Sequence, residues 1–97
     1  MIKSLNKYNY WIHLLWQTVG DTLIVLSQFW SKNEVLGAGM GTPTMILYLK
    51  NPGEYNVWLP FLNDSLNLIT GQDLSSKRNI ENFVMYNNSI NQELRKP

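Results

Sequence analysis

The chain has 97 residues, a length that predicts one domain with a modest apolar core, and we expect that domain to span residues 1–88. The formal net charge is +1 and 15 % of the residues are charged, so the composition supports neither a polyanion-binding surface nor an acidic mimic of nucleic acid. The sequence contains no cysteine, which excludes disulfides, thiol catalysis and thiolate metal sites.

Residues 5–19 have the periodicity of an amphipathic helix. With about 100° between successive residues, apolar side chains gather on one face, whereas His13 and Gln17 lie on the other. Gly20 follows at a position where glycine commonly ends a helix. The pattern predicts a solvent-exposed His13 and a buried apolar face. That face consists of Leu5, Tyr8, Trp11, Ile12, Leu15, Trp16 and Val19.

Residues 10–30 have the length of a membrane-spanning helix, which needs about 20 residues. Several polar residues interrupt this stretch, however, and Asp21 would bring a carboxylate into the apolar interior of the bilayer at a high energetic cost. We therefore expect no membrane span, and a cytoplasmic protein.

Residues 21–30 are rich in β-branched side chains, and we interpret them as the first strand of a sheet, followed by a turn at 31–34. Segment 35–42 has glycine at alternate positions. A phosphate-binding loop requires a helix after its glycines, whereas here a second predicted strand follows and Gly-Lys-Ser/Thr is missing. We therefore interpret 35–42 as a flexible connection or a glycine bulge at the edge of the sheet.

Residues 42–63 predict an antiparallel β-hairpin. Two runs of β-forming residues flank Asn51-Pro52-Gly53-Glu54, where proline suits the second turn position and glycine accepts the positive φ of the third. This combination of strand-forming runs and turn chemistry is typical of a hairpin.

Both faces of the predicted hairpin are apolar. The protein's own helices and loops could cover both faces, or a partner could cover one of them, and a one-residue bulge would exchange the two faces. Because side chains alternate along a strand, one face contains Ile46, Tyr48, Val57, Leu59 and Phe61. The other face is the candidate partner-binding patch, with Trp58 as its hot spot. It contains Met45, Leu47, Leu49 and Trp58.

The C-terminal third predicts one helix. Residues 66–70 could form a fourth strand, and Asp73 or one of the serines after it can cap the following helix. Asn87 and Asn91 would interrupt the apolar stripe of that helix, so we expect it to end one residue after Asn87. Residues 89–97 are then a polar tail.

The predicted order of elements is α–β–β–β–(β)–α. Adjacent antiparallel strands with helices gathered on one face form an α+β fold with two layers. The sheet would have three or four strands and would be covered by two helices.

The candidate chemistry is sparse. His13 is the only histidine, so a transition-metal site would depend on one imidazole and carboxylates, which is a poor ligand set. We expect no metal, no cofactor and no enzymatic activity. A weak alternative is a small hydrolase in which Asp21 orients His13 as a general base.

We expect a non-enzymatic domain that binds another protein or a second copy of itself as a homodimer. The sequence contains many asparagines, a bias that is typical of a low-GC genome and that we assign no chemical role. Small size and this bias would suit an accessory, immunity-type or phage-encoded inhibitor. The alternative is a nucleic-acid-binding domain that uses cationic side chains together with stacking aromatic rings. Those cations are Lys50, Lys77 and Arg78, and the rings are Tyr48, Tyr55 and Trp58.

Overall fold

The computed structural model describes residues 2–32 and 39–95, and this part of the chain forms five α-helices and no strand. The α+β prediction is therefore wrong, and the β-hairpin predicted at 42–63 does not form. The helices are α1 (Ile2–Gln17), α2 (Thr22–Lys32), α3 (Gly41–Lys50), α4 (Pro60–Thr70) and α5 (Ile80–Glu93).

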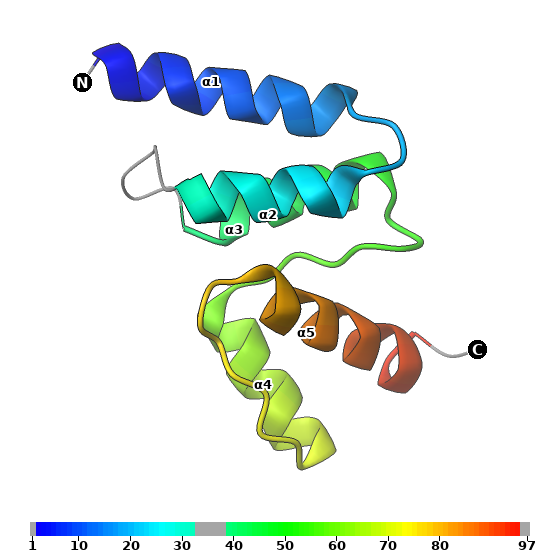
Figure 1. Ribbon diagram of the computed structural model, residues 1–97. Helices are drawn as coiled ribbons and strands as arrows, with labels where there is room; N and C mark the ends of the chain where they lie inside the picture. The colour runs from blue at the N-terminus through cyan, green and yellow to red at the C-terminus, as the bar shows by residue number, and fades with distance from the viewer. Residues whose placement is uncertain (1, 33–38, 96–97) are drawn as a thin grey trace.

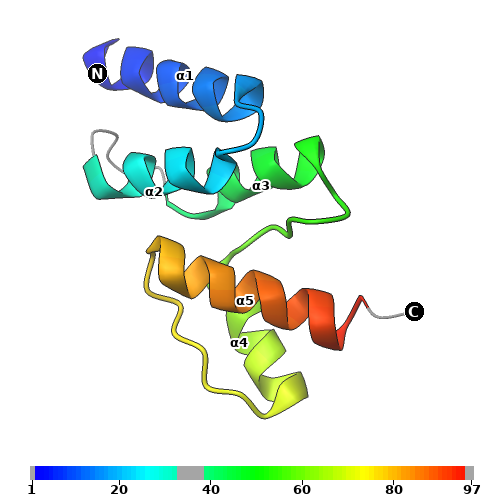
Figure 2. The same cartoon turned by 45° about the vertical axis from the view of Figure 1, so that its right-hand side comes forward.

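The helices form an elongated molecule with extents of 42 × 24 × 17 Å. Helix α1 lies at one end, α2 and α3 form the next layer, and α4 and α5 lie at the other end (Figure 1). Helices α1, α3 and α5 run in the same general direction, and α2 runs in the opposite one (Figure 2).

The helix predicted at 5–19 is confirmed as α1. Trp11 is buried as expected, whereas Trp16 is 54 % exposed and Val19 lies beyond the end of the helix. Gly20 has the expected positive φ of 96°. The side chain of Leu5 lies outside the described part of the structure. None of the helices in the described residues is long and apolar enough to cross a membrane.

Helix α2 replaces the first predicted strand. Its buried residues recur at intervals of three and four, which is the period of one helix face, whereas a strand would have divided them between two faces. They are Thr22, Val25, Leu26, Phe29 and Trp30. The ring of Phe29 stacks on Trp11 of α1 with centroids 5.5 Å apart. Helical periodicity thus prevails over the β-branched composition of the segment.

Helices α3 and α4 replace the two strands of the predicted hairpin. Pro43 stands in the first turn of α3, where its missing N–H costs nothing. Pro60 is the first residue of α4, and Gly71 ends that helix in the left-handed conformation with φ of 74°. The possible fourth strand at 66–70 is the C-terminal half of α4.

A turn is present at 52–54, but Gly53 lacks the positive φ predicted for it, so the turn is of another type. It joins a helix to an extended segment, 55–59, that has no strand beside it. We call residues 55–59 the extended segment. Asn51 begins the turn, and its carbonyl oxygen accepts hydrogen bonds from the N–H groups of Glu54 and Tyr55. The chain then runs between the α2–α3 layer and α5 (Figure 2).

Side chains of α5 bind the extended segment in place of a neighbouring strand. Asn87 Oδ1 accepts hydrogen bonds from the N–H and the side-chain amide of Asn56, at 2.9 and 2.8 Å. The amide groups of Asn87 and Asn91 both donate to the carbonyl oxygen of Glu54, at 2.9 and 3.0 Å. Because buried backbone groups must find partners, inward-facing asparagines can replace a strand's hydrogen bonds.

The expected end of the last helix is therefore wrong, since α5 continues to Glu93. Asn87 is buried because the extended segment binds its amide, and Ser89 is buried as well. The helix begins after Asn79, whose side chain accepts a hydrogen bond from Asn82 N–H, and not at the caps expected earlier in the chain.

The core is centred on Trp58, which has no exposed surface. Its ring centroid lies 5.7 Å from Trp30, 5.8 Å from Phe83 and 6.0 Å from Tyr86. Aromatic rings at these separations contribute packing beyond simple burial. The extended segment thus carries the residue that joins α2 to α5.

Half of the glycine-rich connection predicted at 35–42, residues 35–38, lies outside the described residues. Of its described part, Gly41 and Thr42 begin α3. A side chain at Gly41 would clash with Leu59, because a Cβ there would come within 2.7 Å of Leu59 Cδ2.

Candidate functional site

The structure divides the predicted partner-binding patch between the core and the surface. Leu47 and Trp58 are completely buried, whereas Met45 and Leu49 are 48 % and 60 % exposed. The alternation of a strand would have placed all four on one face, but a helix turns each residue about 100° from the last. Met45 and Leu49 instead share the outer face of α3 with Tyr48, which is 40 % exposed.

Lys50, one of the three predicted nucleic-acid-binding cations, caps the C-terminus of α1. Its Nζ donates hydrogen bonds to the carbonyl oxygens of Leu15 at 2.7 Å and Thr18 at 2.5 Å. A cation at this position offsets the partial negative charge of the helix end. Partial burial lowers the pKa of the Lys50 ammonium. Lys50 also lines a cavity of about 280 Å³, with Glu54 among the other lining residues.

The three cations do not form one basic surface. Lys50 is the last residue of α3, whereas Arg78 lines a cavity at the first residues of that helix, about 15 Å away along a ten-residue helix. Lys77 is exposed beside Arg78. Of the aromatic side chains suggested as stacking groups, Tyr55 and Trp58 are buried. The geometry therefore gives the nucleic-acid alternative no support.

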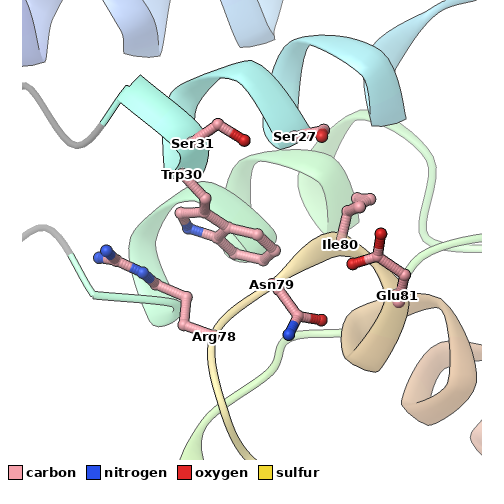
Figure 3. A pocket seen from close by; sticks show the side chains of 7 residues that line it. All are labelled: Ser27, Trp30, Ser31, Arg78, Asn79, Ile80 and Glu81. Atoms are coloured by element: carbon pink, nitrogen blue, oxygen red, sulfur yellow. The ribbon is translucent and has the colours of Figure 1, made fainter.

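A second cavity, of about 150 Å³, lies between the end of α2 and the start of α5. Arg78 lies on one side of Trp30 and Glu81 on the other (Figure 3). The cavity is therefore bordered by charges of opposite sign. The Trp30 indole donates a hydrogen bond to the Gly39 carbonyl oxygen at 3.2 Å. The cavity is smaller than the roughly 300–1,000 Å³ of most ligand sites.

The residues of the hydrolase alternative are exposed and separate. His13 lies on the outer face of α1, Asp21 lies between α1 and α2, and no hydrogen bond joins their side chains. Within residues 2–32 and 39–95 there is also no group of three or more histidine, aspartate or glutamate side chains that could hold a metal ion.

The most distinctive surface is the outer face of α4. Phe61 is 64 % exposed, Leu68 is 88 % exposed and Ile69 is 67 % exposed. With Ser65 they fall within an arc of about 100° on the helix, because each residue turns about 100° from the last. We call these four residues the α4 outer stripe. Large apolar side chains of a helix normally face the core, so an apolar outer face requires an explanation.

The inner face of α4 contains amides that fix the orientation of the helix. Asn63 is completely buried; its Oδ1 accepts a hydrogen bond from the Trp58 indole at 3.0 Å, and its Nδ2 donates to the Leu74 carbonyl at 2.8 Å. Asn67 exchanges two hydrogen bonds of 2.9 Å with the backbone of Leu74. Rotating α4 to bury its apolar stripe would leave Trp58 Nε1 and the Leu74 carbonyl without these partners.

The composition of α4 narrows what its outer face can bind. The helix contains no lysine or arginine, and its single charged residue, Asp64, lies at the edge of the stripe. A surface for phosphate groups, whether of nucleic acid or of lipid, would need cations.

The sequence contains a signal for this face that our prediction missed. Pro60 and Gly71 are the start and stop signals of a helix, and the spacing of Phe61, Leu68 and Ile69 places them together. Dividing residues 60–70 between a hairpin and a fourth strand concealed that spacing.

No protein-family model, curated protein sequence or solved structure matches this chain, so its own geometry is the basis for assigning a function.

Proposed function

We propose that the chain is a small, non-enzymatic protein–protein interaction domain and that it binds its partner through the α4 outer stripe. The observation that supports this proposal is the apolar outer face of α4, which is exposed although the helix also buries Leu66 on its inner face. The amides of the helix face inward, and three large apolar side chains are between 64 % and 88 % exposed. Exposed apolar patches of a few hundred Å² usually mark interaction sites.

The spacing of the stripe suits a helical or otherwise apolar protein surface. Phe61, Leu68 and Ile69 lie at positions i, i+7 and i+8, which is the spacing that one helix presents to another. Removing such side chains from water favours association, and the lost freedom of the two partners offsets part of that gain. A domain with one binding face of this kind would suit an accessory protein or an inhibitor, including the immunity-type and phage-encoded classes, which act by covering a target surface.

The proposal is tested with Leu68→Glu and a matched control, Gln92→Glu, on the exposed face of α5. Both variants should keep the wild-type circular dichroism and melting temperature, because both side chains are exposed. Differently tagged copies of the chain and the native host extract serve as sources of partner. Any candidate is identified by mass spectrometry and the complex is then reconstituted from purified components.

We expect Leu68→Glu to lose the reconstituted complex and Gln92→Glu to retain it. Equal binding by both folded variants would overturn the role of the stripe. Salt-dependent retention of the wild-type chain on a nucleic-acid column would instead favour the nucleic-acid alternative, because phosphate contacts release counterions.

A further inference from the structure

A cavity of about 280 Å³ lies where three helix ends meet. The end of α1, the start of α2 and the end of α3 lie on the same side of the molecule (Figure 1 and Figure 2), and the turn after α3 contributes Glu54 to the lining. We call this space the Lys50 cavity. Its volume is close to the lower end of the roughly 300–1,000 Å³ of most ligand sites, so a small molecule would fill it.

One part of the lining of the Lys50 cavity is positively charged. The Lys50 ammonium has three N–H donors, and two of them donate to the carbonyl oxygens of Leu15 and Thr18. The third forms no hydrogen bond within the described part of the chain. The two carbonyl groups thus hold the ammonium in place, and an acidic group in the cavity can accept from Lys50 without displacing either of them.

The Thr22 side chain is an independent sign of a ligand. It is only 6 % exposed and lines the cavity, and its hydroxyl forms no hydrogen bond within residues 2–32 and 39–95. No fully enclosed polar side-chain atom of these residues lacks a partner, so the Thr22 hydroxyl has access to the cavity. Buried hydroxyls are nearly always paired, and this one therefore indicates a group from outside the chain.

Thr22 is also the first residue of α2, and the N-terminus of a helix attracts negative charge. Asp21, which precedes it, is exposed and does not line the cavity. The free N–H of Lys50 and the hydroxyl of Thr22 together suit a carboxylate.

The turn after α3 contributes the opposite charge. The Asn51 amide donates a hydrogen bond of 2.8 Å to the Glu54 carboxylate. Burial raises the pKa of Tyr55, and the neighbouring Glu54 carboxylate raises it further, which places that carboxylate beside the Tyr55 hydroxyl. Lys50 and Glu54 line the same cavity, but no ion pair joins them in the described residues, and partial burial of Lys50 lowers its pKa without an offset from Glu54. The cavity therefore has two separate charges of opposite sign.

We propose that the Lys50 cavity binds a free α-amino acid with an aliphatic side chain. The carboxylate of the ligand lies between Lys50 and Thr22, and its ammonium lies against Glu54 and Tyr55. The aliphatic side chain covers Val19, which lines the cavity and is 96 % exposed. A zwitterion satisfies both charges of the cavity, whereas a simple anion or cation leaves one of them without a partner. This inference is independent of the α4 outer stripe, because α4 lies at the other end of the molecule (Figure 1).

Isothermal titration calorimetry of the full chain with L-leucine tests the proposal. We expect saturable binding of one leucine per chain and a rise in melting temperature with leucine concentration, because the ligand stabilises the folded state. Two analogues each lack one charge: 4-methylpentanoate has no ammonium and 3-methylbutylamine has no carboxylate. Each should bind at least about tenfold more weakly than leucine. Absence of saturable leucine binding at millimolar concentrations would overturn the proposal, and equal binding of leucine and both analogues would overturn the zwitterion.

Three variants locate the binding site. Glu54→Gln removes the charge but keeps an acceptor for the Asn51 amide, and it should weaken leucine binding about tenfold or more. Glu93→Gln, at the exposed end of α5, makes the same change of charge and should bind leucine like the wild type.

Thr22→Val keeps the shape of the side chain and should keep the melting temperature, because the hydroxyl has no protein partner to lose. It should nevertheless weaken leucine binding about tenfold. Unchanged leucine affinity in both Glu54→Gln and Thr22→Val would place any binding outside the Lys50 cavity and overturn the inference.

Discussion

Helices α2 and α4 each contain eleven residues, and their buried faces differ, because α2 buries mainly apolar side chains whereas α4 buries an amide, that of Asn63, beside Leu66. Helix α2 buries Phe29 and Trp30 and is held by apolar packing. Helix α4 buries Asn63 with Leu66 and exposes Phe61 and Leu68, so hydrogen bonds and apolar packing together set its orientation. The comparison shows that one small fold can fix a helix by its amides and leave its apolar face available for binding.

The largest expected difference is in the loss of stability when a leucine is replaced by alanine in each of the two helices. Leu26 of α2 is completely buried and Leu68 of α4 is 88 % exposed. We expect Leu26→Ala to lower the free energy of unfolding by about 2–5 kcal/mol, because it leaves a cavity in the core. Leu68→Ala should change it by less than about 0.5 kcal/mol. Urea denaturation of both variants measures the difference, and equal losses would contradict the exposed position of Leu68.

The second prediction removes an amide that orients α4. Asn63→Ala should destabilise the fold by about 1–3 kcal/mol, because the Trp58 indole loses its buried acceptor and the Leu74 carbonyl keeps only its hydrogen bond from Asn67. Asn88→Ala, at an exposed position of α5, is the matched control and should change stability little. If Asn63→Ala melts like Asn88→Ala in a thermal scan, hydrogen bonds do not set the orientation of α4.

The third prediction concerns the alkaline limit of stability. Burial raises the pKa of Tyr86 to about 12 from its ordinary value of 10.0, and its hydroxyl donates a hydrogen bond to the Val57 carbonyl at 2.7 Å. Between these two pH values the unfolded chain loses the Tyr86 proton and the folded chain keeps it, so stability falls as pH rises.

Tyr86→Phe should lower stability at neutral pH by about 0.5–1.5 kcal/mol through the lost hydrogen bond, and it should flatten the alkaline decline. Tyr10→Phe, at a residue that is 61 % exposed, is the control and should keep the wild-type slope. Urea titrations at a series of alkaline pH values measure both slopes. An unchanged slope in Tyr86→Phe would contradict the assignment.

The smallest expected effect on stability is that of replacing Asp64, the charged residue at the edge of the α4 outer stripe. Asp64→Asn should leave stability within about 0.5 kcal/mol of the wild type, because Asp64 is exposed. Urea denaturation measures the change, and a clearly larger loss of stability would contradict the exposed position of Asp64.

Residue patterns predicted the local elements that depend on near neighbours. The apolar period around Trp11 identified α1, and Gly20 has the positive φ expected after a helix. A turn forms at Pro52-Gly53, but without the positive φ predicted for Gly53. The same kind of signal was present for α2 and α4 but was given less weight than β-branched composition. Composition is the weaker guide, because packing context readily overrides intrinsic strand preference.

The hydrogen bonds that position the candidate site join groups that lie far apart in the chain. We attributed the asparagines to genomic bias, yet Asn87 binds the backbone 31 and 33 residues earlier and Asn63 binds the backbone 11 residues later. An asparagine on an apolar stripe indicates the end of a helix unless a backbone group from a distant segment forms a hydrogen bond with its amide. The residues around each asparagine in the sequence do not indicate such a long-range hydrogen bond.

The sequence by itself determined the features that depend on single residues and near neighbours: an amphipathic first helix, a turn at Pro52-Gly53 and the lack of thiols. Only the tertiary structure decided which polar groups are buried and which apolar groups are not. The physical reason is that a buried amide requires a hydrogen-bond partner, and here the partners are carbonyl and N–H groups of segments that fold back from elsewhere. Once Asn63 and Asn67 had found them, Phe61, Leu68 and Ile69 could only face outward.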